Sequence, residues 1–242
     1  MRQQVQTAIR IIYPPRCVSC GDRVAGDFAL CGPCWRETPF IGDSVCDLCG
    51  APQLSSAPAE ALICDACQAM PRPWRQGRAA LLYQGNARRL ILALKHGDRT
   101  ELARPMSRWL FEAAQPLFRP DLIVAPVPLH WRRLLKRRYN QSALLAAGLA
   151  KMMHVELCPD LLQRTKATPS LEGISREARF QTLRDVIQVH PRHVDRIKNR
   201  SILLIDDVMT TGATLDAASR ACKMSQANDV CVIALARVVK HI

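Results

Sequence analysis

The feature that most constrains this chain is its N-terminal cysteine pattern. Eight of the eleven cysteines lie within residues 17–67 and form four C-x-x-C pairs. Two such pairs supply the four thiolates of a tetrahedral zinc site, so the pattern predicts two structural zinc ions with every coordination position filled. The expected metal ligands are Cys17, Cys20, Cys31, Cys34, Cys46, Cys49, Cys64 and Cys67.

Disulfides, an iron–sulfur cluster and redox-active C-x-x-C pairs are the alternatives to zinc. The N-terminal residues lack the apolar core and cleavage site of a secretory signal, which argues against disulfides, and the repeated pairs lack a thioredoxin-like context. Gly21 and Gly50 directly follow two of the pairs, where tight turns are needed. Intervals of ten residues between the first two pairs and fourteen between the last two favour sequential pairing over a cross-braced arrangement.

Charge divides the chain into two regions. Residues 1–75 hold seven basic and seven acidic side chains, so the net charge of +13 falls in residues 76–242, with 27 basic against 14 acidic. We expect a double zinc ribbon over residues 1–75, ending in a Pro-rich linker, and a second domain over residues 76–242. A basic domain favours a polyanionic partner, either nucleic acid or a phosphorylated small molecule. No apolar run approaches the roughly 18 residues of a membrane span, and we expect a cytoplasmic protein.

Beyond the linker, short apolar runs alternate with segments of helical period. Strands are expected over residues 79–83, 122–127, 202–208 and 230–237, and helices over residues 87–96, 101–118, 140–154 and 215–224. Such alternation is typical of βαβ units. It predicts an α/β fold in which a mostly parallel sheet is flanked by helices.

The segment ILLIDDVMTTGAT, residues 202–214, carries the strongest functional signal. Its apolar strand ends in Asp206 and Asp207, which places both carboxylates at the carboxyl edge of the sheet, where open α/β folds bind ligands. The turn that follows offers hydroxyl donors, a glycine and a helix start, all suited to phosphate. No glycine is followed by lysine, which excludes the P-loop of nucleotide hydrolases. The residues of the turn are Met209, Thr210, Thr211, Gly212, Ala213 and Thr214.

A second segment, residues 121–142, runs from an apolar strand through Pro128 into a basic stretch. Its five closely spaced cations are Arg132, Arg133, Lys136, Arg137 and Arg138. At the end of a strand they are candidate ligands of pyrophosphate or nucleic acid, and a solvated helix start is the alternative. Trp131 and Tyr139 are either base-stacking surfaces or side chains that pack under the helix.

Together these motifs resemble the ComF family, competence-associated proteins that join a zinc-ribbon module to a type I phosphoribosyltransferase domain. The resemblance rests on the cysteine pairs, on YQGNARRLILALKHGD (83–98), on PVPLHWRRLLKRRYNQS (126–142) and on residues 202–214, which are similar to the phosphoribosyl pyrophosphate (PRPP) motif. It implies that Asp206 and Asp207 are catalytic residues that hold the ribose hydroxyls, and that the turn wraps the 5′-phosphate. Mg²⁺ would accompany PRPP. The further residues expected to bind it are Pro128, Arg132, Arg133 and Arg137.

Three positions depart from the family pattern. Arg138 replaces a glycine, and Leu171 and Thr182 stand where Gln and Asn are usual in a segment that closes over substrate. These departures weaken the expectation of catalysis more than that of binding. The resemblance implies a protein of DNA uptake and natural transformation that binds PRPP and handles single-stranded DNA beside a helicase-like partner. An active phosphoribosyltransferase of unknown acceptor is the alternative.

Overall fold

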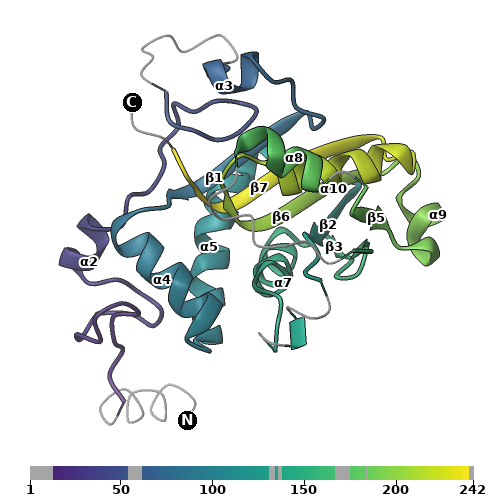
Figure 1. Cartoon of the computed structure of the whole chain (residues 1–242). Helices are drawn as coiled ribbons and strands as arrows, with labels where there is room; N and C mark the ends of the chain where they lie inside the picture. The colour runs from purple at the N-terminus through teal and green to yellow at the C-terminus, as the bar shows by residue number, and fades with distance from the viewer. Residues whose placement is uncertain are drawn as a thin grey trace.

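The computed structural model describes residues 13–53, 62–130, 134–135, 138–166, 175–183 and 185–239 of the 242-residue chain. Two cysteine-rich segments come first and carry the short helices α2 (Gly32–Arg36) and α3 (Asp65–Gln68). An α/β region follows (Figure 1). The described residues include no helix with the length and apolar character needed to cross a bilayer.

A five-stranded sheet forms the centre of the α/β region. Its order is β1-β7-β6-β2-β3, and every neighbouring pair is parallel. The strands are β1 (Gln76–Leu82), β2 (Leu122–Pro126), β3 (Glu156–Leu157), β6 (Ser201–Met209) and β7 (Asp229–Arg237). A separate antiparallel pair consists of β4 (Leu162–Arg164) and β5 (Ile187–Val189). The predicted α/β fold with a mostly parallel sheet is confirmed.

Helices cover both faces of this sheet (Figure 1). One face carries α4 (Gly85–His96), α5 (Ala103–Ala114) and α7 (Gln141–Met153), and the other carries α8 (Arg176–Leu183) and α10 (Ala213–Met224). The short α9 (Val194–Ile197) and the 3₁₀ turn η3 (Pro191–His193) precede β6. Two separate hydrophobic cores result, one on each face.

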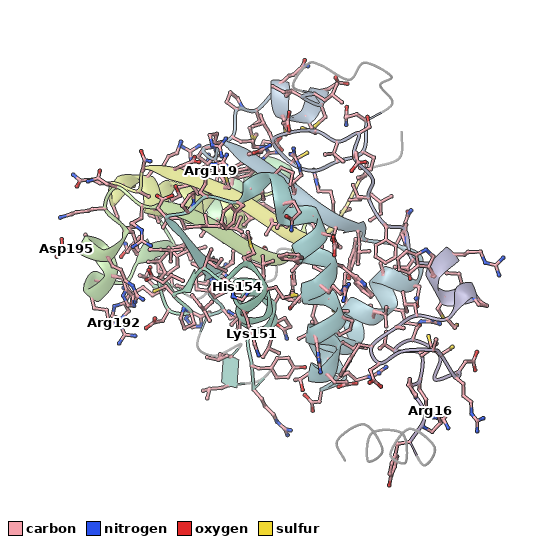
Figure 2. The ribbon with its side chains drawn as sticks, turned by 180° about the vertical axis from the view of Figure 1, so that it is seen from behind. Arg16, Arg119, Lys151, His154, Arg192 and Asp195 are labelled. Atoms are coloured by element: carbon pink, nitrogen blue, oxygen red, sulfur yellow. The ribbon has the colours of Figure 1, made fainter. Side chains whose placement is uncertain are left out.

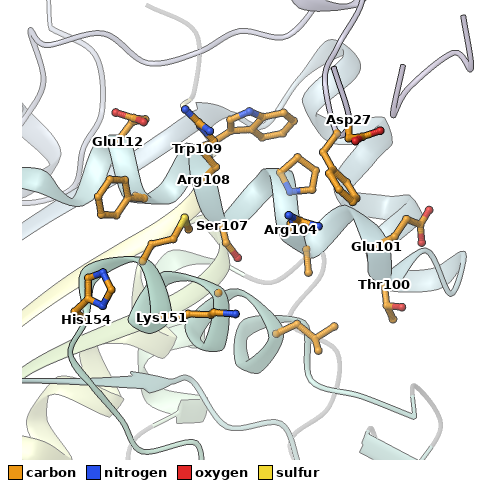
Figure 3. A pocket seen from close by; sticks show the side chains of 17 residues that line it. Asp27, Thr100, Glu101, Arg104, Ser107, Arg108, Trp109, Glu112, Lys151 and His154 are labelled. Atoms are coloured by element: carbon orange, nitrogen blue, oxygen red, sulfur yellow. The ribbon is translucent and has the colours of Figure 1, made fainter. Parts of the chain in front are cut away.

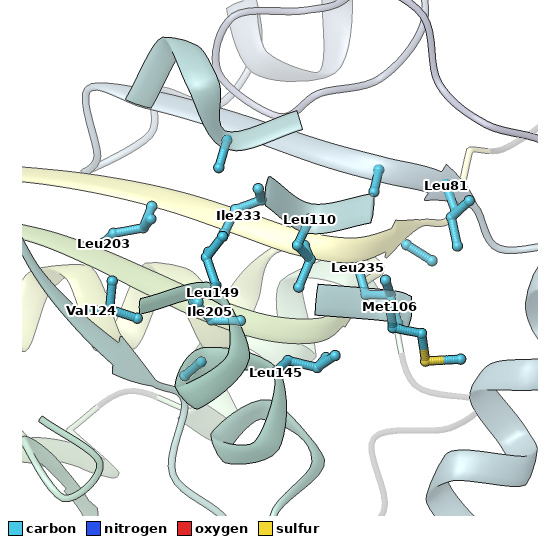
Figure 4. Packing of buried hydrophobic residues seen from close by; sticks show 14 of the residues in the cluster. Leu81, Met106, Leu110, Val124, Leu145, Leu149, Leu203, Ile205, Ile233 and Leu235 are labelled. Atoms are coloured by element: carbon cyan, nitrogen blue, oxygen red, sulfur yellow. The ribbon is translucent and has the colours of Figure 1, made fainter. Parts of the chain in front are cut away.

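The alternation of side chains along β6 connects the two cores. Leu203 and Ile205 enter the core under α5 and α7, whereas Ile202 and Leu204 enter the core under α10, because successive strand residues point to opposite faces. Figure 4 shows the first of these cores, in which residues of α5 and α7 pack against β6 and β7. Its labelled residues include Met106, Leu110, Leu145, Leu149, Ile233 and Leu235.

The predicted helix over residues 101–118 is interrupted at both ends. It is divided into η1 (Thr100–Leu102), α5 and η2 (Gln115–Leu117). Pro116 in η2 has no N–H to donate, so the regular α-helical bonding ends there and the chain tightens into a 3₁₀ turn. The other predicted helices and strands are observed, with ends that move by a few residues.

The two cysteine-rich segments pack on opposite faces of the sheet. Val18 of the first belongs to the core under α5 and α7, whereas Cys46 and Cys49 of the second belong to the core under α10. Between them the chain runs antiparallel beside the outer edge of β1, where the Leu82 amide donates to the Pro39 carbonyl at 2.9 Å. The second segment therefore shares a core with the sheet, and the division at residue 75 stays a prediction.

Candidate functional site

The four cysteine pairs form two separate clusters. The sulfur atoms of each cluster lie within 4.8 Å of one another, with 3.5 Å between Cys20 and Cys31 and 3.7 Å between Cys49 and Cys64. Thiolates about 2.3 Å from one tetrahedral zinc ion lie about 3.8 Å apart, so both clusters fit structural zinc. The first ribbon uses Cys17, Cys20, Cys31 and Cys34, and the second uses Cys46, Cys49, Cys64 and Cys67. The predicted sequential pairing is confirmed.

Backbone geometry prepares both clusters for a metal. Gly21 and Gly50 adopt left-handed conformations with φ of +85° and +67°, which closes the turn behind each leading pair. Backbone amides also point at the sulfur atoms: Cys31 donates to Cys17 Sγ at 3.3 Å, and Cys64 donates to Cys46 Sγ at 3.4 Å. These N–H groups favour the thiolate form that zinc requires.

The acidic pair, Asp206 and Asp207, lies where β6 approaches the carboxyl edge of the sheet. Asp206 Oδ1 accepts a hydrogen bond from Ser142 Oγ at 3.3 Å, and Asp207 Oδ1 lies 3.1 Å from Lys95 Nζ. Ser142 belongs to the first turn of α7 and Lys95 to the last turn of α4. Residues from three distant parts of the sequence thus converge on two neighbouring carboxylates.

One carboxylate of the pair titrates near neutral pH. Burial and the neighbouring negative charge of Asp207 raise the pKa of Asp206 to about 7, against the smaller opposing effect of Lys95. Lys95 and Ser142 offset only part of the repulsion between these two adjacent carboxylates. The arrangement is suited to hydroxyl groups and to a divalent cation, because oxygen ligands are those that Mg²⁺ prefers.

The Thr-Gly loop, residues 209–214, follows the acidic pair and leads into α10. Gly212 is the N-cap of this helix and has a left-handed φ of +84°. The hydroxyl oxygen of Thr211 accepts from the Ala213 amide at 3.3 Å, and Thr210 Oγ1 accepts from Arg179 Nη1 of α8 at 3.0 Å. A helix N-terminus with backbone amides, hydroxyls and a guanidinium nearby is a favourable environment for phosphate.

The end of β2 lies beside this loop. Val127 donates its amide to the Ile205 carbonyl at 2.9 Å, so the strand that leads to the buried Pro128 ends next to the acidic pair. Asn140 caps α7 by accepting from the Ser142 amide and also donates to the Val127 carbonyl at 3.0 Å. The ends of β2 and β6 and the start of α7 therefore meet at one sheet edge.

Only part of the basic stretch can be placed. Arg132, Arg133 and Arg137, together with Trp131, Lys136 and Leu171, lie outside the described residues. Arg138 is exposed, adopts a left-handed φ of +66° and lies 3.7 Å from Asp98, so it keeps the conformation that glycine adopts readily. Tyr139 packs against the core and donates its hydroxyl to the Leu94 carbonyl at 2.5 Å, which favours packing over base stacking.

Sequence reasoning did not single out several residues of this site. Lys95 lies in the 83–98 segment on which the family resemblance rests, but nothing in that segment identifies it as the partner of Asp207. Thr182, where Asn is usual, donates its hydroxyl to the Ala178 carbonyl at 2.7 Å and so bonds within its own helix. Behind the Thr-Gly loop lie two further arginines, Arg72 and Arg237, whose side chains reach its backbone carbonyls.

A large pocket lies away from this edge, between α5, α7 and the first ribbon (Figure 3). Its volume is about 1250 Å³. Three cations and three carboxylates line it, so its formal charges balance and it offers no net attraction to an anion. The charged residues are Arg104, Arg108, Lys151, Asp27, Glu101 and Glu112.

A third group of metal-ligand residue types is formed by Cys158, Asp160 and His193. Two arginines contact it: Arg192 pairs with Asp160, and Arg196 Nη1 lies 3.7 Å from Cys158 Sγ. Arg192 lies at the outer edge of the molecule beside α9 (Figure 2). Arg192 already neutralises Asp160, and burial raises the pKa of the Cys158 thiol, so this group is described better as an ion-pair cluster than as a metal site.

Comparison with known proteins agrees with this description. Residues 8–68 match the double zinc ribbon domain family. The chain is 30% identical over 212 residues to DNA utilization protein YhgH of Escherichia coli, which covers 85% of this chain and 89% of that protein. It is 27% identical over 229 residues to competence protein F of Haemophilus influenzae, which covers 92% and 96%.

Among solved structures, adenine phosphoribosyltransferase from Thermoanaerobacter pseudethanolicus is similar at 16% identity and a TM-score of 0.36. The similarity covers 58% of this chain and 82% of that one. The parallel sheet, with an acidic pair and a Thr-Gly loop at the end of its central strand, agrees with the type I phosphoribosyltransferase fold predicted from the sequence.

Proposed function

The chain belongs to the ComF family of competence and DNA utilization proteins, and on that premise we propose that it binds PRPP with Mg²⁺ and handles single-stranded DNA during DNA uptake. The observation that carries the PRPP site is the convergence of the acidic pair, the Thr-Gly loop and the end of β2 at one sheet edge. We place this activity in the cytoplasm, where thiols stay reduced and available to zinc.

In the proposed complex each part of the edge has a separate role. Asp206 and Asp207 would hold the ribose hydroxyls and help to bind Mg²⁺, which would supply positive charge to offset that of the pyrophosphate. The amides and hydroxyls of the Thr-Gly loop hold the 5′-phosphate at the N-terminus of α10. Arg132, Arg133 and Arg137, which follow Pro128 in the sequence, are the proposed ligands of the pyrophosphate, because guanidinium forks suit phosphate oxygens.

Calorimetric titration of PRPP with Mg²⁺ tests the site. The wild type should bind saturably, whereas the double variant Asp206→Asn, Asp207→Asn should lose binding by at least about 100-fold, because the carboxylates' hydrogen bonds and the charge that attracts Mg²⁺ are removed. Asp195→Asn is the matched control, since this exposed carboxylate lies in α9, at a distance from the edge. Absence of binding by a folded wild type with two zinc ions would refute the proposal.

Single-stranded DNA is the proposed partner because the relatives are named for DNA utilization and competence and because the net charge of +13 falls in residues 76–242. Fluorescence anisotropy with a labelled oligothymidine should show affinity that falls steeply with salt, as for any contact that releases counterions. Replacing Arg132, Arg133 and Arg137 by Glu should reduce affinity by about 10-fold or more and flatten the salt dependence. Salt-independent or absent binding would leave only the PRPP part of the proposal.

A helicase-like partner is proposed from the family resemblance.

Phosphoribosyl transfer is the second candidate activity. The observation that favours it is Arg179 of α8, which contacts the Thr-Gly loop as a helix closing over the site would. Release of pyrophosphate from PRPP in the presence of nucleobases should be measured against an Arg179→Gln variant. Release that requires both an acceptor and Arg179 would establish transfer, and its absence in a protein that binds PRPP would assign binding alone.

A further inference from the structure

The second zinc ribbon lies directly behind the Thr-Gly loop, and we propose that its metal site positions this loop through Arg72, so that zinc in the second ribbon governs phosphate binding at the sheet edge. Arg72 is thus a positioning residue for the proposed PRPP site. The inference rests on the proposed function for its ligand, but the link between the ribbon and the loop stands on contacts of its own.

Arg72 contacts the metal cluster and the loop at the same time. Its Nε lies 3.4 Å from Cys67 Sγ, and its Nη1 donates to the Thr211 carbonyl at 3.0 Å. The guanidinium also lies 5.3 Å from the centre of the Trp74 ring. A planar guanidinium offers donors in fixed directions, so it can join a thiolate to a carbonyl where a lysine ammonium on its flexible stem would not hold both.

The loop carbonyls point toward β7 and the ribbon: those of Met209 and Thr210 toward Arg237 at the end of β7, and that of Thr211 toward Arg72 beside the ribbon. Arg237, which is buried, donates through Nη1 to the Met209 carbonyl at 3.1 Å and to the Thr210 carbonyl. With Arg72 on Thr211, two guanidinium groups hold three consecutive carbonyls. Because the C=O and N–H of a trans peptide point in opposite directions, the amides of residues 210, 211 and 212 face away from β7 and the ribbon. This is the orientation that an anion needs.

Trp74 fixes the distance between ribbon and loop. Its indole N–H donates at 2.5 Å to the carbonyl of Leu48, between two zinc ligands, and its side chain is buried. A Cβ at Gly212 would lie 3.3 Å from Trp74 Cη2 and 3.2 Å from Arg72 Nη1. Arg72 and Trp74 therefore pack closely against the backbone of the loop, and a side chain at Gly212 would have to displace them by a few tenths of an ångström.

Charge gives the metal a role in this arrangement. Four thiolates and one Zn²⁺ carry a net charge of −2, which balances the two guanidinium groups between the cluster and the loop. Arg72 touches this cluster through Cys67, and Arg237 interacts electrostatically with Cys49. Without zinc, Cys67 is no longer fixed by the metal, and Arg72 loses one of its two anchors.

The test compares Arg72→Met with Arg75→Met, a matched control whose guanidinium pairs with Asp229 at 2.6 Å and has no contact with the loop among those described. Both variants should retain two zinc ions. Arg72→Met should speed hydrogen exchange of the loop amides and weaken binding of PRPP with Mg²⁺, each by about 10-fold to 100-fold, the range expected for a charge-assisted hydrogen bond. Arg75→Met should leave both unchanged.

Arg72→Lys keeps the positive charge and replaces the Met variant in this test if that variant does not fold. It should show the same faster hydrogen exchange of the loop amides, because the bridge between Cys67 and Thr211 is lost. Unchanged exchange and affinity in a zinc-loaded Arg72 variant would overturn the inference. If the wild type does not bind PRPP, the proposed function fails, and hydrogen exchange alone still decides whether the ribbon holds the loop.

Discussion

The two zinc ribbons of this chain have the same ligand pattern and support different parts of the molecule. The first ribbon contributes Val18 to the core under α5 and α7 but keeps its zinc ligands outside that core, and polar contacts hold it to the start of α4, where Asn86 donates to the Cys34 carbonyl at 3.2 Å and to Thr38 Oγ1 at 2.8 Å. The second ribbon places Cys46 and Cys49, both fully buried, in a hydrophobic core that also contains Met209. A shared motif thus defines the metal site, whereas the packing around it determines what the metal stabilises.

Removing one zinc ligand from each ribbon should give the largest difference between them. Cys49→Ser should destabilise the whole α/β region by at least about 3 kcal/mol, because structural zinc contributes about 10–16 kcal/mol and this cluster is part of the core. Cys20→Ser, at the corresponding position of the first ribbon and exposed, should lose zinc while the sheet stays folded. Calorimetry with zinc analysis measures both effects. If both variants lost the unfolding transition of the α/β region, the two ribbons would not differ in what they stabilise.

The acidic pair lies on the α4 and α7 side of the loop, so its titration should not depend on the second ribbon. Because the folded pKa of Asp206 is raised to about 7, the folded state binds a proton that the unfolded state releases near pH 4. Stability therefore falls as pH rises from about 4 to about 7 and then levels off.

Asp206→Asn should abolish this fall and be more stable than the wild type above pH 7, by a few kcal/mol. Denaturant unfolding between pH 4 and pH 9 measures the effect. The same pH dependence is expected in Arg72→Met. A wild-type stability that rises with pH over this range would show that Asp206 is not the group that titrates, and a changed profile in Arg72→Met would couple the two sides of the site.

Asn86 offers a sharper test of the first ribbon. Asn86→Ala removes bonds to Cys34 and Thr38 and leaves the hydroxyl of Ser19 without the Asn86 oxygen that it contacts at 2.6 Å. We expect a loss of about 2 kcal/mol, because these groups are largely buried. Two zinc ions and the PRPP affinity should be retained. Gln115→Ala, an exposed amide bonded to its own helix, should change stability by less than about 0.5 kcal/mol.

The smallest effect is expected at Arg138, which contacts neither ribbon among the described residues. Arg138→Gly relieves a left-handed backbone by about 1 kcal/mol but increases the entropy of the unfolded chain by a similar amount. The exposed pair with Asp98 contributes little. Urea unfolding should therefore show a change within about 0.5 kcal/mol. A larger change would show that the arginine side chain itself holds the 126–142 segment.

Local patterns in the sequence predicted much of the fold and the ligands of both metal sites. Strand 202–208 is observed as β6 because a buried parallel strand is a continuous apolar run, and the zinc clusters pair as the interval lengths indicated. Short elements such as β3, with two residues, were not predicted, since so few residues show no periodicity.

The supporting residues of the candidate site were beyond sequence reasoning for a different reason. Lys95 and Asp207, or Arg72 and Thr211, are far apart in the chain and meet only because the sheet and the ribbon pack as they do. A lone arginine five residues after a zinc ligand resembles any surface cation. The acidic pair and the Thr-Gly loop were visible because their chemistry is contiguous in the sequence.

The strand order has a consequence for the order in which the protein is made. β1 is the first strand of the sheet to leave the ribosome, yet its partner within the sheet, β7, is the last. Until residues 229–237 are synthesised, β1 has beside it only the cysteine-rich segments that precede it, which can already take up zinc. The metal-bearing end of the chain can thus cover one edge of β1, the outer one, against intermolecular pairing while β7 is still being translated.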